Sequence, residues 1–277
     1  MHNNLLLVGY KPIFVSSNHY LSSLKRKYKI KSGGYLGTLD PFAKGAMIIA
    51  FGQYTKLLPH LKKEKKVYRA TLWLGALSES LDIENILEIK EVPSFDISRV
   101  QSILDSLLGT IAYTPPKFSA KHIQGQRAYD LARRGVEFEL PKCEMQIFDI
   151  KLLSYTHPFL SFEVSVSSGA YVRSIGEMIA NALGVNGVLS MLERIEDGGF
   201  RVRNREEMVL DPLKALDYPI LENLSNDIKD KISKGQKFHL KNLENGLYVT
   251  NFDDFFSIIE VKKDASIRYI LNRMIKC

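Results

Sequence analysis

The chain carries, at residues 34–45, the string Gly34-Tyr35-Leu36-Gly37-Thr38-Leu39-Asp40-Pro41-Phe42-Ala43-Lys44-Gly45, in which three glycines frame one carboxylate. Glycine permits backbone angles and close approaches that a Cβ would forbid, so the three glycines predict a tight loop held against a ligand. Pro41 disfavours the helical region for Asp40 and pushes that residue toward an extended conformation. The apolar run at residues 46–51 is typical of a buried strand or helix and would anchor the loop.

This string is more specific than its parts. An isolated Asp-Pro pair is usually an ordinary turn, with the Asp side chain bonded to nearby backbone. The whole string resembles the nucleophile loop of the pseudouridine synthases, most closely the tRNA pseudouridine synthase B family, whose bacterial members carry Gly-His-x-Gly-x-Leu-Asp-Pro-x-Ala-x-Gly. The resemblance implies that Asp40 is the catalytic aspartate. Tyr35 departs from the pattern, because it stands where the family has a histidine that helps occupy the space left by the flipped base.

Length, charge and cysteine content narrow the class of protein. The chain has 277 residues, of which 45% are hydrophobic and 25% charged, as expected for a globular protein. An excess of 38 Lys and Arg over 31 Asp and Glu favours a polyanionic partner such as nucleic acid over an acidic membrane surface. Cys143 and Cys277 have no metal or redox spacing. No apolar run approaches membrane-spanning length, so we expect a soluble, untargeted, cytoplasmic protein.

Two further motifs follow in the family's order. Lys66-Val67-Tyr68 opens an alternating apolar and polar stretch that predicts a strand, although a tyrosine there is more often packing than chemistry. Gly169-Ala170-Tyr171-Val172-Arg173 leads into a predicted helix, where an arginine at the first turn needs an acidic partner or forms an ordinary salt bridge. The resemblance implies that Tyr68 lies over the target base and that Arg173 pairs with Asp40.

The resemblance also implies a substrate-binding set. Residues 78–82 match an acidic segment of the family, which makes Asp82 a candidate for positioning substrate. Residues 114–121 and 125–135 resemble the family's substrate-binding insertion, a loop leading into a basic helix, although a proline-stiffened connection followed by a surface helix is an equal alternative. The implied substrate-binding residues are Lys11, Tyr35, Lys56, Asp82, Ser119, Lys121, Arg127, Tyr171 and Leu192.

A basic run precedes the glycine string. Ser16-Ser17-Asn18 offers cap residues for a helix whose apolar side includes Leu21 and Leu24. Lys25, Arg26 and Lys27 on that helix are, taken alone, a solvated face. Beside a loop that modifies RNA, we favour phosphate contacts instead.

The expected fold class is α/β (α+β), a pseudouridine synthase fold with a curved, mainly antiparallel sheet, flanking helices and the active cleft across the middle. We expect a catalytic domain at 1–210, with the insertion at about 110–140, and a short C-terminal module at 211–277 that weakly resembles the RNA-binding PUA module. Patterning predicts a helix at 97–108 stopped by Gly109, a helix near 227–233, and strands at 247–250 and 256–261.

The implied reaction converts uridine to pseudouridine. The bond from ribose to N1 must break, and the uracil must rotate and rejoin through C5. Asp40 would form a covalent adduct or stabilise charge, Arg173 would keep it ionised, and Tyr68 would stack on the base and could help remove the C5 proton. No metal or other cofactor is expected. The implied substrate is the T-stem-loop of tRNA, with a uridine at conventional position 55 that must be extruded, bound by a protein expected to be a monomer.

Two alternatives stay open. One is a pseudouridine synthase that acts on another RNA. The Pro-Pro-Lys-Phe-Ser-Ala string at 115–120 argues against it, because this string resembles the synthase B group. The other is a catalytically silent RNA-binding or RNA-chaperone protein. The joint presence of Asp40, Tyr68 and Arg173 argues against this second alternative.

Overall fold

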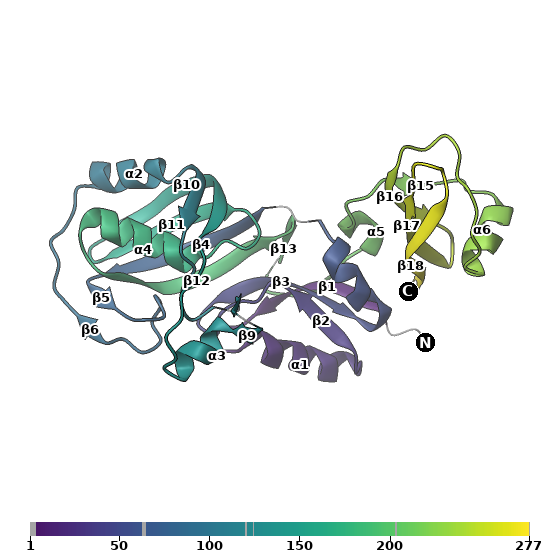
Figure 1. Cartoon of the computed structure of the whole chain (residues 1–277). Coiled ribbons are helices and arrows are strands. Elements are labelled where there is room, and N and C mark those ends of the chain that lie inside the picture. Colours follow the sequence, from purple (N-terminus) through teal and green to yellow (C-terminus); the bar gives the residue numbers. More distant parts are fainter. Residues whose placement is uncertain (1–3, 63–64, 120, 124, 203, 277) are drawn as a thin grey trace.

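The structure is a computed structural model that describes residues 4–62, 65–119, 121–123, 125–202 and 204–276. Within these ranges one large sheet has the order β14-β1-β3-β12-β4-β11-β10-β7, with β2 added on β3 and β13 on β12 (Figure 1). Its pairs are antiparallel except for β3 with β12. The expected mainly antiparallel sheet with packed helices is confirmed.

The strands of the large sheet are β1 (Leu5–Lys11), β2 (Gly33–Leu36), β3 (Lys44–Phe51), β4 (Lys66–Leu74), β7 (Gly109–Tyr113), β10 (Cys143–Thr156), β11 (Phe159–Val166), β12 (Gly187–Asp197), β13 (Phe200–Arg201) and β14 (Met208–Val209). Two small ribbons pair β5 (Ala76–Leu77) with β6 (Glu88–Ile89) and β8 (His122–Ile123) with β9 (Gln126–Arg127). The helices are α1 (Ser17–Tyr28), the 3-10 helix η1 (Gly52–His60), α2 (Ile97–Ser106), α3 (Ala128–Arg133), α4 (Val172–Leu183), α5 (Pro212–Ala215) and α6 (Asn226–Ser233).

Helix α1 begins where the sequence places it. The Ser16 hydroxyl accepts the backbone N–H of His19 at 3.1 Å, which satisfies one free donor of the first turn. Leu21 and Leu24 then pack against a buried side of β1 and β3 that includes Met47. Helix α1 therefore packs on the face formed by β1 and β3, and it lies below β1 and β2 in Figure 1.

Helix α4 brings Arg173 to the sheet. It begins after Tyr171 and ends at Gly184, whose φ of +79° is the left-handed conformation expected at a helix end. Its buried side, including Ile175 and Ile179, packs in the apolar cluster under β4, β11 and β12. This packing fixes the first turn of α4 beside the loop after β2.

Two expectations about local structure were wrong. The helix expected at 97–108 ends at Ser106, and Gly109, with φ of +104°, opens strand β7 instead of stopping the helix. Gly34 is also not part of a tight loop, because it lies in β2 and pairs with Ala50. Leu107 and Leu108 continue the apolar spacing, but the chain must turn there to reach the edge of the large sheet.

The C-terminal residues form a second sheet with the order β15-β16-β17-β18, made of β15 (Ile220–Leu221), β16 (Gly246–Asn251), β17 (Phe255–Val261) and β18 (Ile267–Ile275). The predicted α6, β16 and β17 are confirmed, whereas β18 was missed. Phe256 and Met274 of this sheet share one apolar cluster with Val8 and Ile48 of the large sheet. The boundary at 211 stays a prediction.

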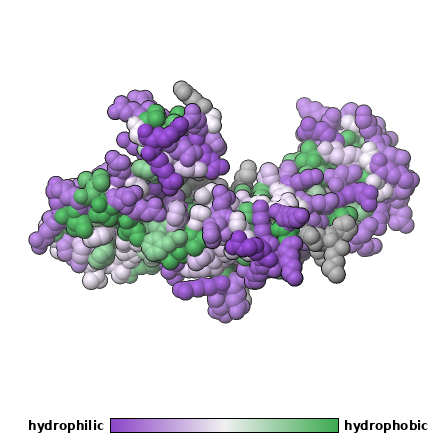
Figure 2. All heavy atoms as spheres, turned by 90° about the horizontal axis from the view of Figure 1, so that it is seen from below, coloured by the Kyte–Doolittle hydropathy of each residue, from purple (hydrophilic) through white to green (hydrophobic). Residues whose placement is uncertain are grey.

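Across the described residues, no helix has the length and apolar character needed to cross a membrane. Hydrophilic residues cover most of the face seen in Figure 2, with smaller apolar patches among them.

Candidate active site

The loop between β2 and β3 presents Asp40 above a rigid base. Phe42 and Ala43 are fully buried behind it, and Leu39 is bound on both sides by one hydroxyl. The Ser17 hydroxyl donates to the Leu39 carbonyl at 2.9 Å and accepts its N–H at 3.0 Å. The Asp40 side chain itself remains 32% exposed. The loop thus offers a half-exposed carboxylate on a fixed backbone.

Gly45 is required by a close approach of two strands. A Cβ at this position would lie 2.2 Å from the backbone oxygen of Arg194 on β12, and the φ of Gly45 is +120°. The parallel pairing of β3 with β12 starts at this point. Gly45 therefore lets β12 reach the Asp40 loop.

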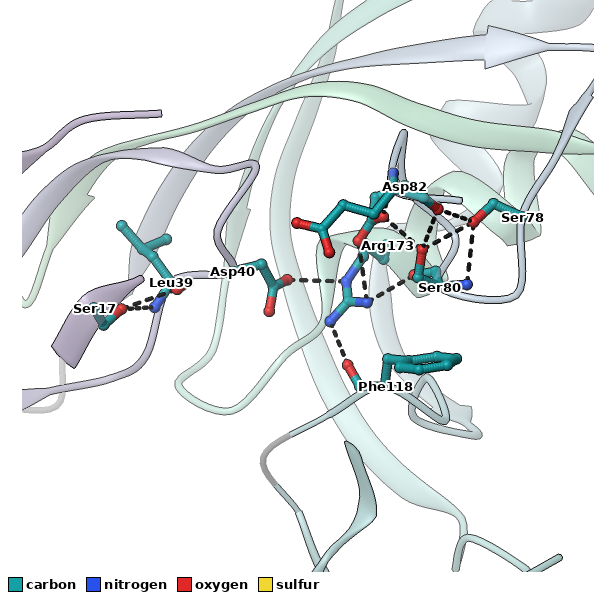
Figure 3. A network of polar contacts seen from close by, with 9 residues as sticks. Ser17, Leu39, Asp40, Ser78, Ser80, Asp82, Phe118 and Arg173 are labelled. Carbon is teal, nitrogen blue, oxygen red and sulfur yellow. Dashed lines mark hydrogen bonds and ion pairs between the residues drawn. The ribbon is translucent and has the colours of Figure 1, made fainter. Parts of the chain in front are cut away.

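Arg173 is the charged partner of Asp40. Its Nε lies 2.9 Å from Asp40 Oδ2 and its Nη1 lies 3.4 Å from Asp82 Oδ2 (Figure 3). The same guanidinium donates to the backbone carbonyls of Ser80 at 2.7 Å and Phe118 at 2.8 Å. The Arg173 side chain is only 3% exposed, so these contacts are made inside the protein. The expected pair with Asp40 is present in this geometry.

Asp82 lies behind Arg173, away from solvent. Burial raises the pKa of Asp82, although the hydrogen bond from Ser80 and the charge of Arg173 act in the opposite direction. The Ser80 hydroxyl donates to Oδ1 at 2.5 Å, and the Glu84 N–H donates to the same oxygen at 2.9 Å. Asp82 therefore orients Arg173 from the side opposite Asp40 (Figure 3).

A cavity of about 260 Å³ opens on one side of Asp40. Tyr68 and Leu192, from β4 and β12, line it together with Tyr171 and Arg173 at the start of α4. Burial raises the pKa of Tyr171. The structure thus brings together the three expected catalytic residues and two of the expected substrate-binding residues around one apolar and charged hollow.

A buried ion network forms the floor of this cavity. Asp197, which is fully buried, lies 3.0 Å from Lys66 Nζ and 3.2 Å from Arg194 Nη2. Arg194 Nη2 also donates to the carbonyl of Gly37 at 3.1 Å. Burial alone would lower the pKa of Arg194, but the charge of Asp197 and the contact with Tyr68 raise it overall. The network ties the Asp40 loop to Tyr68 and β12.

The sequence reasoning missed the role of this network. Lys66 opens the motif that contains Tyr68, but no sequence pattern marked Asp197 as the shared partner of Lys66 and Arg194. The sequence signal for this ion pair is an acidic residue three positions after an arginine. On a regular strand, residues three positions apart point to opposite faces, so the signal does not predict a contact. Irregular pairing of β12 with β4 between Arg194 and Glu196 brings the two side chains together.

A second cavity, of about 330 Å³, lies on the other side of Asp40. Four of the expected substrate-binding residues line it, namely Tyr35, Asp82, Ser119 and Arg127. The Tyr35 hydroxyl donates to Asn18 Oδ1 at 3.1 Å. Because Asp40 and Arg173 border both cavities, the carboxylate stands on the ridge between them.

Three expected substrate-binding residues line neither cavity. Lys56 is exposed on η1. The Lys121 ammonium contacts the thiol of Cys143. The other cysteine, Cys277, lies outside the described residues. Lys11 is fully buried, and its Nζ donates to the carbonyls of Val15 at 2.5 Å, Pro12 at 3.0 Å and Pro41 at 3.3 Å. Substrate binding by these three residues stays a prediction.

Within the described ranges, no group of three or more His, Cys, Asp or Glu side chains is placed to hold a metal ion.

Comparison with known proteins identifies the family of the chain. Residues 25–172, more than half of the chain, match the family model described as TruB family pseudouridylate synthase (N terminal domain). The chain belongs to this family. A tRNA pseudouridine synthase B from Helicobacter hepaticus is 57% identical over 99% of this chain and 96% of its own length. The corresponding protein of Campylobacter jejuni subsp. jejuni is 49% identical over 99% of this chain and its full length.

Solved structures share the fold of this pseudouridine synthase at low identity. A crystal structure of a Cbf5-Nop10-Gar1 complex aligns with 100% of this chain and 85% of its own, with a TM-score of 0.66 and 15% identity. An archaeal box H/ACA sRNP Nop10-Cbf5 complex aligns with 98% of this chain and 86% of its own, with a TM-score of 0.66 and 16% identity. The resemblance inferred from the Asp40 string is confirmed, and the chain is an isomerase.

Proposed function

We propose that this enzyme isomerises uridine to pseudouridine in tRNA, at the T-loop uridine of conventional position 55, and that Asp40 is its catalytic carboxylate. The observation that carries the proposal is the Asp40–Arg173 pair at the edge of a cavity lined by Tyr68 and Leu192. Relatives that match 99% of the chain are named tRNA pseudouridine synthase B. Their name supports tRNA as the substrate.

Asp40 acts on the ribose or the base once the uridine has entered the 260 Å³ cavity. A carboxylate is able to form a covalent adduct or to stabilise the charge that develops when the bond from ribose to N1 breaks. Arg173 fixes the orientation of this carboxylate through Nε. Because the guanidinium is anchored by two backbone carbonyls and Asp82, it holds Asp40 in place before substrate arrives.

Tyr68 and Leu192 hold the detached uracil. The Tyr68 ring is 7% exposed and Leu192 is 5% exposed, so both present apolar surface to the cavity and little to bulk solvent. A base stacked on such a ring is able to rotate in its own plane without losing contact. In this proposal, Tyr68 also helps to remove the C5 proton.

The target base must leave the RNA stack before it can reach Asp40, and extrusion costs a few kcal/mol. The second cavity, with Tyr35, Ser119 and Arg127, then takes nucleotides beside the target. Arg127 is exposed and is suited to contact phosphate. Tyr35 supplies an aromatic face where the family pattern has histidine. We further propose that the enzyme acts on the T-stem-loop as a cytoplasmic monomer and without a metal ion.

The test is tritium release from tRNA labelled at C5 of uridine, followed by mapping of the modified nucleotide. The proposal predicts release from whole tRNA and from an isolated T-stem-loop, with one modified position, 55. Release from a different RNA alone would favour a synthase with another target. Tight RNA binding without release from any uridine would favour a silent RNA-binding protein.

A further inference from the structure

The turn between β1 and α1 holds an aromatic ring in an unusual setting. Phe14 has a φ of +60°, a left-handed conformation that bulky residues rarely adopt. Its side chain is nevertheless 66% exposed, and the neighbouring Ile13 is 40% exposed. Two apolar side chains thus face solvent on one short turn, one of them in a backbone conformation that favours glycine.

The ring contributes little to the fold of this turn. Val15, the next residue, packs on the apolar cluster beneath α1, but Phe14 belongs to none of the apolar clusters formed by the described residues. A left-handed bulky residue is a local strain, and such strain persists where the surrounding structure holds it. Stability of the turn would be served better by glycine.

The same turn is fastened to the catalytic loop. The Phe14 N–H donates to the carbonyl of Pro41 at 2.7 Å, one residue beyond Asp40. Lys11 Nζ donates to that carbonyl and to the carbonyl of Val15. Pro41 and Ser16 border the second cavity as well. Phe14 is therefore a solvent-facing ring on a turn whose backbone is bonded to the catalytic loop and whose neighbour Ser16 borders the second cavity.

We propose that Phe14 is a stacking platform for an unpaired base next to the target uridine. The inference rests on the proposed function, since an RNA that places a uridine at Asp40 must pass the adjoining loop residues. Aromatic side chains recognise unstacked bases in RNA loops through their flat faces. Because the backbone of the turn is already held by hydrogen bonds, stacking on Phe14 orders only the two torsions of its side chain, which keeps the entropic cost low.

Substitution by glycine separates stacking from folding. Glycine adopts a φ of +60° without penalty, so Phe14→Gly keeps the turn and its bond to Pro41, and its thermal midpoint should not fall. Its Kd for a T-stem-loop should rise about fivefold or more, the scale of one lost base-aromatic stack. Phe14→Tyr should bind within about twofold of the unchanged protein, because the aromatic face is retained.

Two control variants test separately the left-handed backbone and the exposed aromatic ring of Phe14. Asn204→Gly relieves another left-handed residue, with a φ of +51°, that lies outside both cavities and outside the C-terminal module. Phe148→Ala removes a ring that is 53% exposed on β10 and lies outside both cavities. Neither control should change the Kd for RNA.

Fluorescence of 2-aminopurine identifies the base. The probe is placed, one position at a time, at the unpaired nucleotides on either side of the target in the T-stem-loop. The proposal predicts one position whose fluorescence is quenched by the unchanged protein and by Phe14→Tyr but not by Phe14→Gly. Unchanged RNA affinity and unchanged quenching in Phe14→Gly would overturn the proposal, as would an effect of that variant on self-association alone. Isomerisation by the unchanged protein is assayed in parallel, so failure of the proposed function is seen separately.

Discussion

Arg173 Nε lies 2.9 Å from Asp40 Oδ2, and this contact joins the first turn of α4 to the loop between β2 and β3. The two residues differ in exposure, because the arginine is buried and the aspartate reaches the cavity. The buried partner therefore orients the exposed one. Asp82 completes the arrangement from behind, so one guanidinium serves two carboxylates.

Removal of Arg173 should damage both folding and chemistry. Arg173→Met leaves Asp82 buried without its cation, which should lower the free energy of unfolding by about 3–5 kcal/mol. Arg173→Lys restores a charge but cannot reach Asp40, Ser80 and Phe118 at once, so it should recover stability more than kcat. Urea unfolding and single-turnover assays measure the two effects.

The control variant is Arg69→Met, which breaks an exposed pair with Glu163 and should lower the free energy of unfolding by no more than about 1 kcal/mol. Wild-type turnover in Arg173→Met would refute the proposed role.

Tyr35 tests whether stacking replaces the extruded base. Tyr35→Phe removes only the hydroxyl that donates to Asn18, so binding of a structured T-stem-loop should be nearly unchanged. Tyr35→Ala should cost roughly 1–3 kcal/mol of binding, and less with an unstructured oligonucleotide in which little stacking is replaced. Asn18→Ala is the control for the hydrogen bond. If Phe proves as damaging as Ala, the hydroxyl is the important group.

The basic run on α1 should contribute to the salt dependence of RNA binding. Each phosphate contact releases counterions, so neutralising Lys25, Arg26 and Lys27 together should flatten the slope of log Kd against log salt. Lys27 is already paired with Glu207 at 2.7 Å, so the flattening should be smaller than three full contacts. The matched control is the triple substitution of Arg69, Lys90 and Lys151, exposed cations outside the C-terminal module that are each paired with a carboxylate. Equal slopes for both triple variants would show that the basic run on α1 is a solvated face and makes no phosphate contacts.

Lys11 should give the protein a pH-dependent stability. Burial lowers the pKa of Lys11 to about 8, although the charge of Asp40 raises it. Between pH 8 and the ordinary lysine pKa of about 10.5, the unfolded chain holds a proton that the folded protein has released, so stability rises with pH across this window. The gain relative to Lys11→Met is at most about 3 kcal/mol. Urea unfolding of both proteins from pH 7.5 to 10.5 measures it, and parallel curves would contradict the assignment.

The residues around Asp40 were predictable because their constraints are local in sequence. Gly37 and Gly45 indicate unusual backbone conformations, and Ser16 indicates the start of a helix. The alternation of apolar and polar residues after Lys66 indicates a strand. Each signal needs only a few neighbouring residues. The expected pairing of Arg173 with Asp40 came instead from resemblance to a family, and the structure contains it.

Other features depend on contacts that the sequence does not display. The burial of Lys11 follows from three carbonyls, one of them on Pro41, thirty positions away. The contact between Arg194 and Asp197 depends on an irregularity in the pairing of β12 with β4. Strand β18 alternates poorly, since only its first and eighth residues are buried. Tertiary packing determines the burial of Lys11, the Arg194–Asp197 contact and the formation of β18, and the local sequence pattern does not predict such packing.

The most direct test of the central claim is tritium release by Asp40→Asn, measured under single-turnover conditions on C5-labelled tRNA. The asparagine keeps the shape of the loop and can still contact Arg173, but it cannot act as a carboxylate nucleophile or stabilise positive charge as an anion. Asp254→Asn, an exposed carboxylate paired with Lys229, is the matched control and should leave release unchanged. We predict near-complete loss of release in Asp40→Asn, with tRNA bound within several-fold of the unchanged affinity. Substantial turnover by the pure variant would contradict the catalytic role of Asp40.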